Sequence, residues 1–275
     1  MEYAILALDL DGTLTNREKK ITSRTKESIA LARQQRVTVV LASGRPLLGI
    51  LPLARELELL DNEGYLLANN GSQIYDCLQR ECIVEHLLPL GVGCPVFEFA
   101  RAWGLHAVVY DRLGVVAESA GDEYVRREAF NNGVSIREIS HLESEFADVC
   151  LPKIMVVGEP KRAAEALPVL RELLEGSANV FLSEPYFIEI APHGVDKATS
   201  MQWLLDFLQL NRKQMVFCGD GLNDLSMMRL AGMGVAMDNA CDEVKDAASY
   251  ITASNDDDGV AQAVEKLLLK EGVVQ

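Results

Sequence analysis

Short apolar segments that end in polar or glycine-rich turns alternate with helical segments near the N-terminus of this chain. The apolar segments are residues 3–8, 36–42 and 65–68. Residues 23–35 have the spacing of an amphipathic helix, and a second helix is predicted up to residue 59. Because the apolar segments contain few polar residues, they indicate strands that are buried on both faces. The alternation therefore predicts an α/β fold with a doubly wound parallel sheet.

The C-terminal part of the chain repeats this alternation, whereas the middle does not. Helices are predicted over 196–210, 223–231 and 259–270, and strands over 215–218 and 234–237. In the middle, closely spaced strands are predicted at 106–110 and 115–118, beside a later helix over 161–175. Such strand pairs are typical of an α+β arrangement with antiparallel pairing. We therefore expect a core formed by residues 1–83 and 190–275, and an inserted α+β domain formed by residues 84–189.

The charge balance excludes several classes of partner. The 275 residues include 26 Lys and Arg against 41 Asp and Glu, and the resulting net charge of −15 disfavours binding to nucleic acids and anionic membranes. No apolar segment is long enough to span a bilayer, and the first residues lack the basic segment of a signal peptide. The scattered cysteines favour reduced thiols in a cytoplasmic protein. No feature of the sequence predicts an oligomeric state.

Carboxylates follow two of the predicted strands directly. Asp9 and Asp11 come after the first strand, and Asp220 and Asp224 come after the strand at 215–218. The carboxyl ends of parallel strands share one edge of a sheet, so these four side chains are candidates for one site. Hard oxygen ligands of this kind suit Mg²⁺. A solvated turn remains the alternative for either pair taken alone.

Two further groups could complete a phosphate site. Ser43 and Gly44 offer a hydroxyl and a backbone N–H at the end of the second strand, just before a helix. Lys197, near the start of another helix, could place a positive charge on a phosphoryl oxygen. Asn70, followed by Gly71, comes after the third strand and is a candidate to meet Asp9, Ser43 and Asp220 in one crevice.

Taken together and in order, these residues resemble the four motifs of the haloacid dehalogenase-like superfamily. The motifs are Asp-Leu-Asp-Gly-Thr at 9–13, Ser43, Lys197, and Gly-Asp-Gly-Leu-Asn-Asp at 219–224. The sequence is most similar to the Cof-type sugar-phosphatase branch, in which a large cap domain lies between the second and third motifs. The resemblance implies a Rossmann-like core with an inserted cap. It also implies a Mg²⁺-dependent phosphatase that acts on a small phosphorylated metabolite.

The resemblance assigns the reaction to the acidic residues. Asp9 would be the nucleophile and would form an aspartyl-phosphate. Asp11 would protonate the leaving alcohol and then deprotonate the attacking water. Mg²⁺ would be held by the Asp9 carboxylate, the Asp11 backbone carbonyl and Asp220, with Asp224 supporting the metal.

The same resemblance assigns phosphate binding to neutral and basic groups. Ser43, Gly44 and Lys197 would bind phosphoryl oxygens. The family often has Thr where this chain has Ser43, and both supply the hydroxyl. Gly12 and Thr13 would shape the loop after the nucleophile, while Asn223 would orient the phosphate or Lys197. Asn70 and Gly71 resemble the Asn-Gly of the branch at its third strand end, where a substrate contact and a plain Asn-Gly turn are both open.

Two other functions use the same acidic groups. A phosphomutase would form the same aspartyl-phosphate but release an isomerised product. A regulatory protein of the receiver type would be phosphorylated near Mg²⁺ without turning over a substrate. The order of the motifs and the large insert count against a receiver, since a receiver has about half this length.

Overall fold

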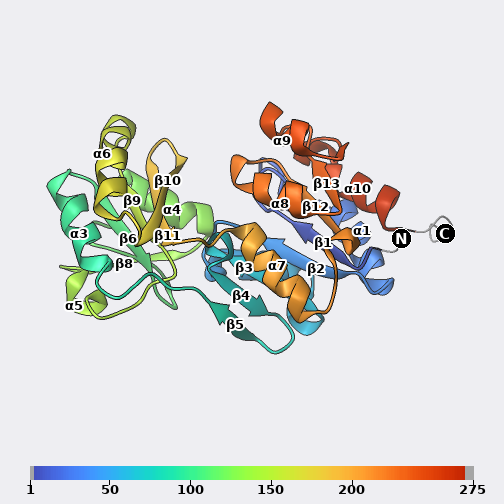
Figure 1. Cartoon of the computed structure of the whole chain (residues 1–275), viewed down its shortest axis with the longest axis horizontal. Coiled ribbons are helices and arrows are strands. Elements are labelled where there is room, and N and C mark those ends of the chain that lie inside the picture. Colours follow the sequence, from blue (N-terminus) through green and yellow to red (C-terminus); the bar gives the residue numbers. More distant parts are fainter. Residues whose placement is uncertain (1–2, 270–275) are drawn as a thin grey trace. The chain divides into compact units, whose positions relative to one another are not determined.

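The apolar segments near both ends of the chain form one eight-stranded sheet (Figure 1). The structure is a computed structural model that describes residues 3–269. In sheet order, the strands are β14 (Tyr250–Ile251), β13 (Met233–Ala236), β12 (Met215–Gly219), β1 (Ile5–Leu8), β2 (Thr38–Ala42), β3 (Gly64–Ala68), β4 (Gln73–Asp76) and β5 (Glu81–Glu85). Neighbouring strands from β14 to β3 are parallel, and β4 pairs antiparallel with β3. All four residues of β1 are buried, which explains why its sequence does not alternate.

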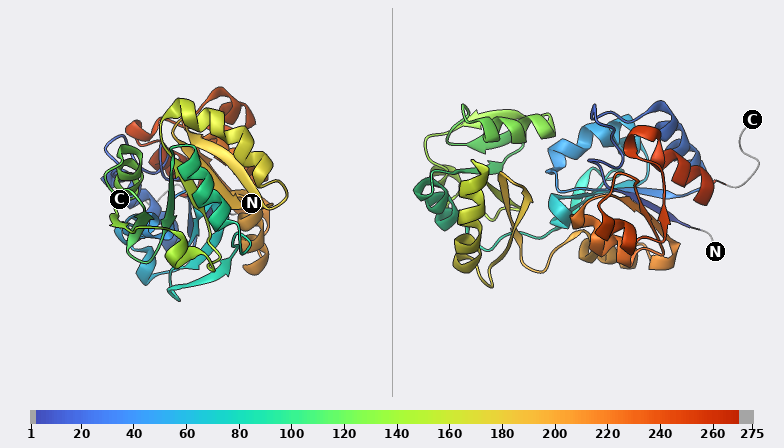
Figure 2. Two further views of the ribbon diagram at one scale, coloured as in Figure 1. Left: turned by 90° about the vertical axis from the view of Figure 1, so that its left-hand side faces the viewer. Right: turned by 90° about the horizontal axis from the view of Figure 1, so that it is seen from above.

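Helices cover both faces of this sheet. They are α1 (Ser23–Gln34), α2 (Leu47–Glu56), α7 (Lys197–Phe207), α8 (Leu225–Leu230), α9 (Asp242–Ala247) and α10 (Gly259–Leu267). The view from above in Figure 2 shows α1 and α10 on one face, where they pack together, and α7 and α8 on the other. The doubly wound, Rossmann-like core that the sequence predicts is therefore confirmed.

Local geometry sets where two helices of the core begin. The first helix is capped by Thr22, whose side chain accepts a hydrogen bond from the Thr25 backbone N–H. The helix predicted over 223–231 begins only at Leu225, because a single 3₁₀ turn precedes it. Residue 270, the last of the helix predicted over 259–270, lies outside the described residues, as do residues 1–2 and 271–275.

The middle of the chain forms a second sheet of six strands. In sheet order, these are β10 (Ala178–Glu184), β11 (Phe187–Pro192), β9 (Ile154–Val157), β6 (His106–Tyr110), β7 (Gly114–Ala117) and β8 (Ser135–Glu138). All neighbours are antiparallel except β7 and β8. The accompanying helices are α3 (Gly93–Ala102), α4 (Glu123–Asn132), α5 (Glu143–Phe146) and α6 (Pro160–Leu173). This is the α+β arrangement that the strand pairs predicted.

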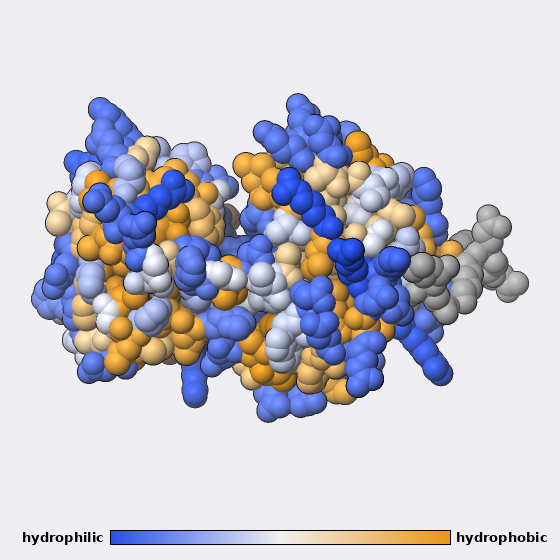
Figure 3. Space-filling model, viewed as in Figure 1, coloured by the Kyte–Doolittle hydropathy of each residue, from blue (hydrophilic) through white to orange (hydrophobic). Residues whose placement is uncertain are grey.

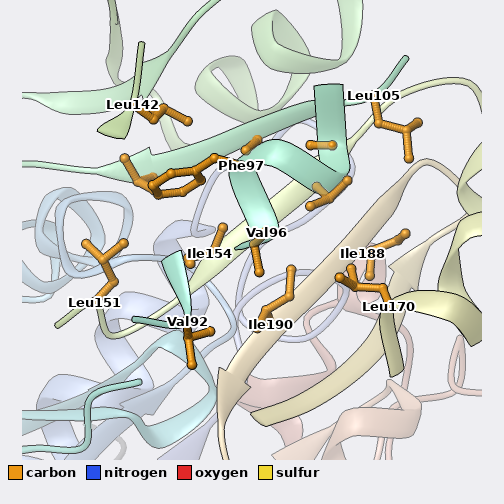
Figure 4. Packing of buried hydrophobic residues seen from close by; sticks show 14 of the residues in the cluster. Val92, Val96, Phe97, Leu105, Leu142, Leu151, Ile154, Leu170, Ile188 and Ile190 are labelled. Atoms are coloured by element: carbon orange, nitrogen blue, oxygen red, sulfur yellow. The ribbon is translucent and has the colours of Figure 1, made fainter. Parts of the chain in front are cut away.

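The second sheet has a hydrophobic core of its own. On one face, Val96 of α3, Ile154 of β9 and Ile190 of β11 point toward one another (Figure 4). The opposite face packs apolar residues against α4, among them Val108 and Met155. A separate core of this size is typical of a segment that forms its own domain.

The chain accordingly divides into two units. Within the described residues, the first contains 3–44, 50–83 and 196–269, and the second contains 45–49 and 84–195. The expected boundary at residue 190 falls inside β11, whose last residues pair with β10, so the second unit extends further. The short segment at 45–49 also groups with the second unit; there, the Asn132 side chain lies against Gly49.

Hydrophilic and apolar side chains are mixed on both units over the face drawn in Figure 3. Among residues 3–269, no helix combines the length and the apolar character needed to cross a bilayer.

Candidate active site

The polar residues that were predicted to meet follow the carboxyl ends of neighbouring parallel strands. Asp9 follows β1, Ser43 follows β2 and Asp220 follows β12 (Figure 1). Backbone hydrogen bonds continue the sheet beyond the strand ends: the Asp9 N–H donates to the Cys218 carbonyl at 3.0 Å, and the Ser43 N–H to the Leu67 carbonyl at 2.9 Å. The loops after β1 and β2 therefore start with residues that still pair with the neighbouring strands, which brings their side chains to the carboxyl edge of the sheet.

Lys197 lies at the centre of the acidic residues. It is the first residue of α7, whose N-cap Asp196 accepts a hydrogen bond from the Thr199 N–H at 2.7 Å. The buried Lys197 ammonium donates to Asp9 Oδ1 at 2.6 Å and to Asp224 Oδ1 at 2.7 Å. One cation thus links the loop after β1 to the loop after β12.

Asp224 organises the loop that contains the fourth motif. Its Oδ2 accepts hydrogen bonds from the backbone N–H groups of Asp220 at 3.1 Å and Gly221 at 3.0 Å, while its Oδ1 faces Lys197. Both oxygens of this fully buried carboxylate are therefore engaged within the protein. Such an arrangement suits a supporting role better than direct contact with a ligand.

The acidic residues carry more negative charge than Lys197 balances. Burial, together with the nearby Asp224 carboxylate, raises the pKa of Asp9 to about 8. Burial also raises the pKa of Asp220 to about 6, although its hydrogen bond from Thr13 acts in the opposite direction. For Lys197, burial lowers the pKa, but the carboxylates of Asp224 and Asp9 outweigh it and raise the pKa above its ordinary value.

This excess of negative charge fits a divalent cation. One carboxylate oxygen from each of Asp9, Asp220 and Asp224 lies within 4.8 Å of the others. The donors are hard oxygens, as Mg²⁺ prefers, and a cation beside them would offset the repulsion that raises the pKa values of Asp9 and Asp220. The residues present therefore fit the metal that the sequence predicted.

Asp11 is placed differently from the other three carboxylates. Its side chain is 40% exposed, and Oδ1 accepts a hydrogen bond from Lys19 Nζ at 2.6 Å. The group of carboxylates close enough to share a cation at this edge contains Asp9, Asp220 and Asp224 but not Asp11. An exposed carboxyl group can exchange protons with solvent, as an acid–base group must.

Gly12 and Thr13 fix the loop after the nucleophile candidate to Asp220. The Thr13 hydroxyl donates to Asp220 Oδ1 at 2.7 Å. Gly12 has a φ of +84°, and a Cβ at this position would overlap the Asp220 carboxylate. Only glycine allows the backbone to pass so close to this side chain.

We expect Gly12→Ala to displace the Asp220 carboxylate and to lower activity sharply, with a loss of about 1–3 kcal/mol of stability from the strained backbone. Gly176→Ala is the matched control, since Gly176 also has a positive φ of +73° but nothing lies within 4 Å of its Cβ position. Steady-state kinetics and urea unfolding of both variants separate the two effects. Equal activity in the two variants would contradict a role for the close approach to Asp220.

The third strand end contributes Asn70 and Gly71, as the sequence suggested. The Asn223 amide donates to Asn70 Oδ1 at 3.4 Å, and a Cβ on Gly44 would lie 3.2 Å from the Asn70 amide. Gly71 has a structural reason to be glycine, because a Cβ there would lie 2.6 Å from the Asp196 carbonyl oxygen. A contact of either residue with substrate stays a prediction.

Sequence reasoning missed one residue in this region. Asn239 follows β13, and its side-chain amide donates to the Gly12 carbonyl at 2.8 Å and to Asp220 Oδ2 at 3.4 Å. The signal was present, because Asp238 and Asn239 are polar residues directly after the apolar strand predicted over 234–237. The rule applied to the other strand ends would have identified this position too.

Comparison with known proteins agrees with the resemblance of the motifs. The model of the haloacid dehalogenase-like hydrolase family matches residues 6–264. A Bacillus subtilis (strain 168) relative, 5-amino-6-(5-phospho-D-ribitylamino)uracil phosphatase YcsE, is 29% identical over 269 residues, covering 98% of this chain and 97% of its own. A crystal structure of a haloacid dehalogenase-like hydrolase from Bacteroides thetaiotaomicron is 43% identical, with a TM-score of 0.93 over 96% of this chain and 99% of that chain. TM0651 from Thermotoga maritima is 28% identical, with a TM-score of 0.87 over 98% of each chain. The chain therefore belongs to the haloacid dehalogenase-like hydrolase family, in its Cof-type branch.

Proposed function

We propose that this phosphatase hydrolyses a small phosphorylated metabolite in a Mg²⁺-dependent reaction that passes through an aspartyl-phosphate on Asp9. The observation that carries the proposal is the buried Lys197, which binds Asp9 and Asp224 at 2.6 and 2.7 Å. This contact holds one carboxylate oxygen of Asp9 and leaves the other available for attack. The proposed nucleophile Asp9, the Lys197 ammonium and the acidic metal site thus share one edge of the sheet.

In the proposed reaction, an Asp9 carboxylate oxygen attacks phosphorus while the bond from phosphorus to the leaving oxygen breaks. Asp11 gives its proton to that oxygen, so the product leaves as an alcohol. The Asp11 carboxylate then takes a proton from a water molecule. This water attacks phosphorus, breaks the bond to Asp9 and releases inorganic phosphate.

The remaining predicted residues would hold the phosphoryl group. The Ser43 hydroxyl, the Gly44 N–H and the Lys197 ammonium would bind its oxygens, with Asn223 orienting the group. Mg²⁺ would be held by the Asp9 carboxylate, the Asp11 backbone carbonyl and Asp220. When bound, it would supply positive charge that reduces the repulsion between the nucleophile and the phosphate.

A small, polar phosphate ester is the substrate class that the comparisons support. The relative YcsE is named for a phosphatase of 5-amino-6-(5-phospho-D-ribitylamino)uracil, which is a small phosphorylated metabolite. We propose a sugar phosphate or a similar ester for this chain, in the cytoplasm. The inserted domain expected at residues 84–189 would act as the cap that recognises the rest of the substrate.

Chelation is expected to abolish turnover, because the charge of the acidic residues would then repel the phosphate. Phosphate release from p-nitrophenyl phosphate should fall by about 10³-fold or more in EDTA, and excess Mg²⁺ should restore it. Activity that survives both EDTA and dialysis would contradict the metal dependence.

Product analysis on a panel of phosphorylated metabolites distinguishes a phosphatase from a phosphomutase, since both would form an aspartyl-phosphate. A phosphatase releases inorganic phosphate from a preferred ester. A phosphomutase instead isomerises its substrate and is activated by a bisphosphorylated sugar.

A further inference from the structure

Asn239 connects three loops at the edge of the sheet through one side-chain amide. Its Nδ2 donates to the Gly12 carbonyl at 2.8 Å and lies 3.4 Å from Asp220 Oδ2. Its Oδ1 accepts a hydrogen bond from the Asn255 backbone N–H at 3.0 Å. Since a backbone N–H can only donate, this last contact fixes the orientation of the amide and directs its NH₂ group to the two oxygens.

The position of Asn239 follows from the order of the strands. It lies after β13, which is adjacent to β12 in the sheet, while Gly12 lies in the loop after β1 on the other side of β12. Asn255, beyond β14, extends the connection, because its side chain donates to the Thr15 carbonyl at 2.8 Å. The loop at residues 11–15 is thus tied to two strand ends from which it is distant in sequence.

We propose that Asn239 is a positioning residue that orients Asp220 and the backbone around Gly12 for metal binding. The inference rests on the function proposed above, in which Asp220 and the Asp11 carbonyl are metal ligands. Asp220 Oδ1 accepts the hydrogen bond from Thr13, and Asn239 constrains Oδ2 from the other side. The NH₂ group of Asn239 therefore fixes the distance between the Asp220 carboxylate and the backbone at Gly12, next to the Asp11 carbonyl that is the neighbouring ligand in this proposal.

The chemistry of the amide explains why this residue type is suited to the position. One nitrogen with two hydrogens can donate to Gly12 and Asp220 at once, whereas a hydroxyl has one hydrogen and a carboxylate has none. Hydrogen-bond partners of metal ligands commonly contribute about 10- to 100-fold to metal affinity. Asn239 itself is exposed, so its truncation leaves no cavity in the core.

Binding of Mn²⁺ to the metal-free protein tests this role without reference to turnover. Titration calorimetry should give a dissociation constant about 10- to 100-fold higher for Asn239→Ala and Asn239→Ser than for the wild type. In Asn62→Ala the constant should be unchanged, because the Asn62 side chain is exposed and donates to the Glu58 carbonyl. Having two replacements keeps the test decisive if one of them fails to fold, which thermal unfolding would reveal.

Kinetics provide the second measurement. The Mg²⁺ concentration that gives half-maximal rate should rise by the same factor in both variants, while kcat at saturating Mg²⁺ changes much less. A purely structural role would lower kcat or thermal stability without moving the metal affinity, and this result would overturn the proposal. If the wild type itself binds no Mn²⁺, the proposed metal-dependent function fails first and the positioning role fails with it.

Discussion

Asp9→Asn is expected to reduce kcat by roughly 10⁴- to 10⁶-fold while the protein remains folded. The amide has nearly the shape of the carboxylate, but it cannot serve as the nucleophile that we propose for Asp9. Lys197 keeps its contact with Asp224 at 2.7 Å, so the packing around the site survives the change. The measurement is phosphate release at saturating Mg²⁺, together with the circular dichroism spectrum of the variant.

Asp246→Asn is the matched control for this substitution. Asp246 is an exposed residue of α9, and the same replacement there should leave kcat unchanged. Should Asp9→Asn retain substantial activity in a preparation free of deamidated protein, Asp9 is not the nucleophile.

The pH dependence of the stability of Asp9→Asn, compared with that of the wild type, should show how much the buried Asp9 carboxyl destabilises the fold. The pKa of Asp9 is about 8 in the folded protein against an ordinary value of 3.8, so between these pH values the folded state binds more protons than the unfolded state. In the presence of a chelator, the free energy of unfolding of the wild type should therefore fall as pH rises through this range. Asp9→Asn removes this contribution, so its stability should fall less. Parallel pH profiles for the two proteins would contradict the burial of an ionisable Asp9.

The strand ends were predictable because burial leaves a clear pattern in the sequence. Asp9, Ser43, Asn70 and Asp220 each follow an apolar segment closely, and parallel strands bring such positions to one edge. The sequence could not give the order of the strands, which requires the pairing of β13 with β12. Without that order, the distance from Asn239 to Gly12 could not be inferred, although both residues lie beside predicted strands.

The helix α4 of the inserted unit was harder to predict, for a different reason. In α4, Val125 and Ala129 are buried, but so are Glu128 and Asn132, so the buried face does not stand out by its hydrophobicity. Glu128 accepts hydrogen bonds from the Tyr110 hydroxyl at 2.6 Å and from Asn132 at 2.7 Å. A helix stabilised by such polar contacts shows its buried face only in three dimensions.

Lys197→Met is expected to destabilise the first unit by about 3–5 kcal/mol and to abolish activity. Methionine fills a similar volume, but it leaves Asp9 and Asp224 buried without their cation.

The free energy of unfolding should be measured in urea with a chelator, in a Trp103→Phe background. Trp203 of α7 is then the only tryptophan of the chain, and its fluorescence reports on the first unit. Lys213→Met, at an exposed lysine, is the control and should change little.

The double variant Lys197→Met, Asp224→Asn separates stability from catalysis. Replacing Asp224 removes one of the two carboxylates that lost their partner, so a large part of the stability should return. The side-chain oxygen of the amide introduced by Asp224→Asn can still accept a hydrogen bond from the backbone N–H of Asp220 or Gly221, which keeps the loop after β12 in place. Activity should not return, because no ammonium group would be left to hold Asp9 and the phosphoryl oxygens. Recovery of both stability and turnover would show that Lys197 serves the fold alone. If neither recovers, the lost stability does not come from unpaired charge.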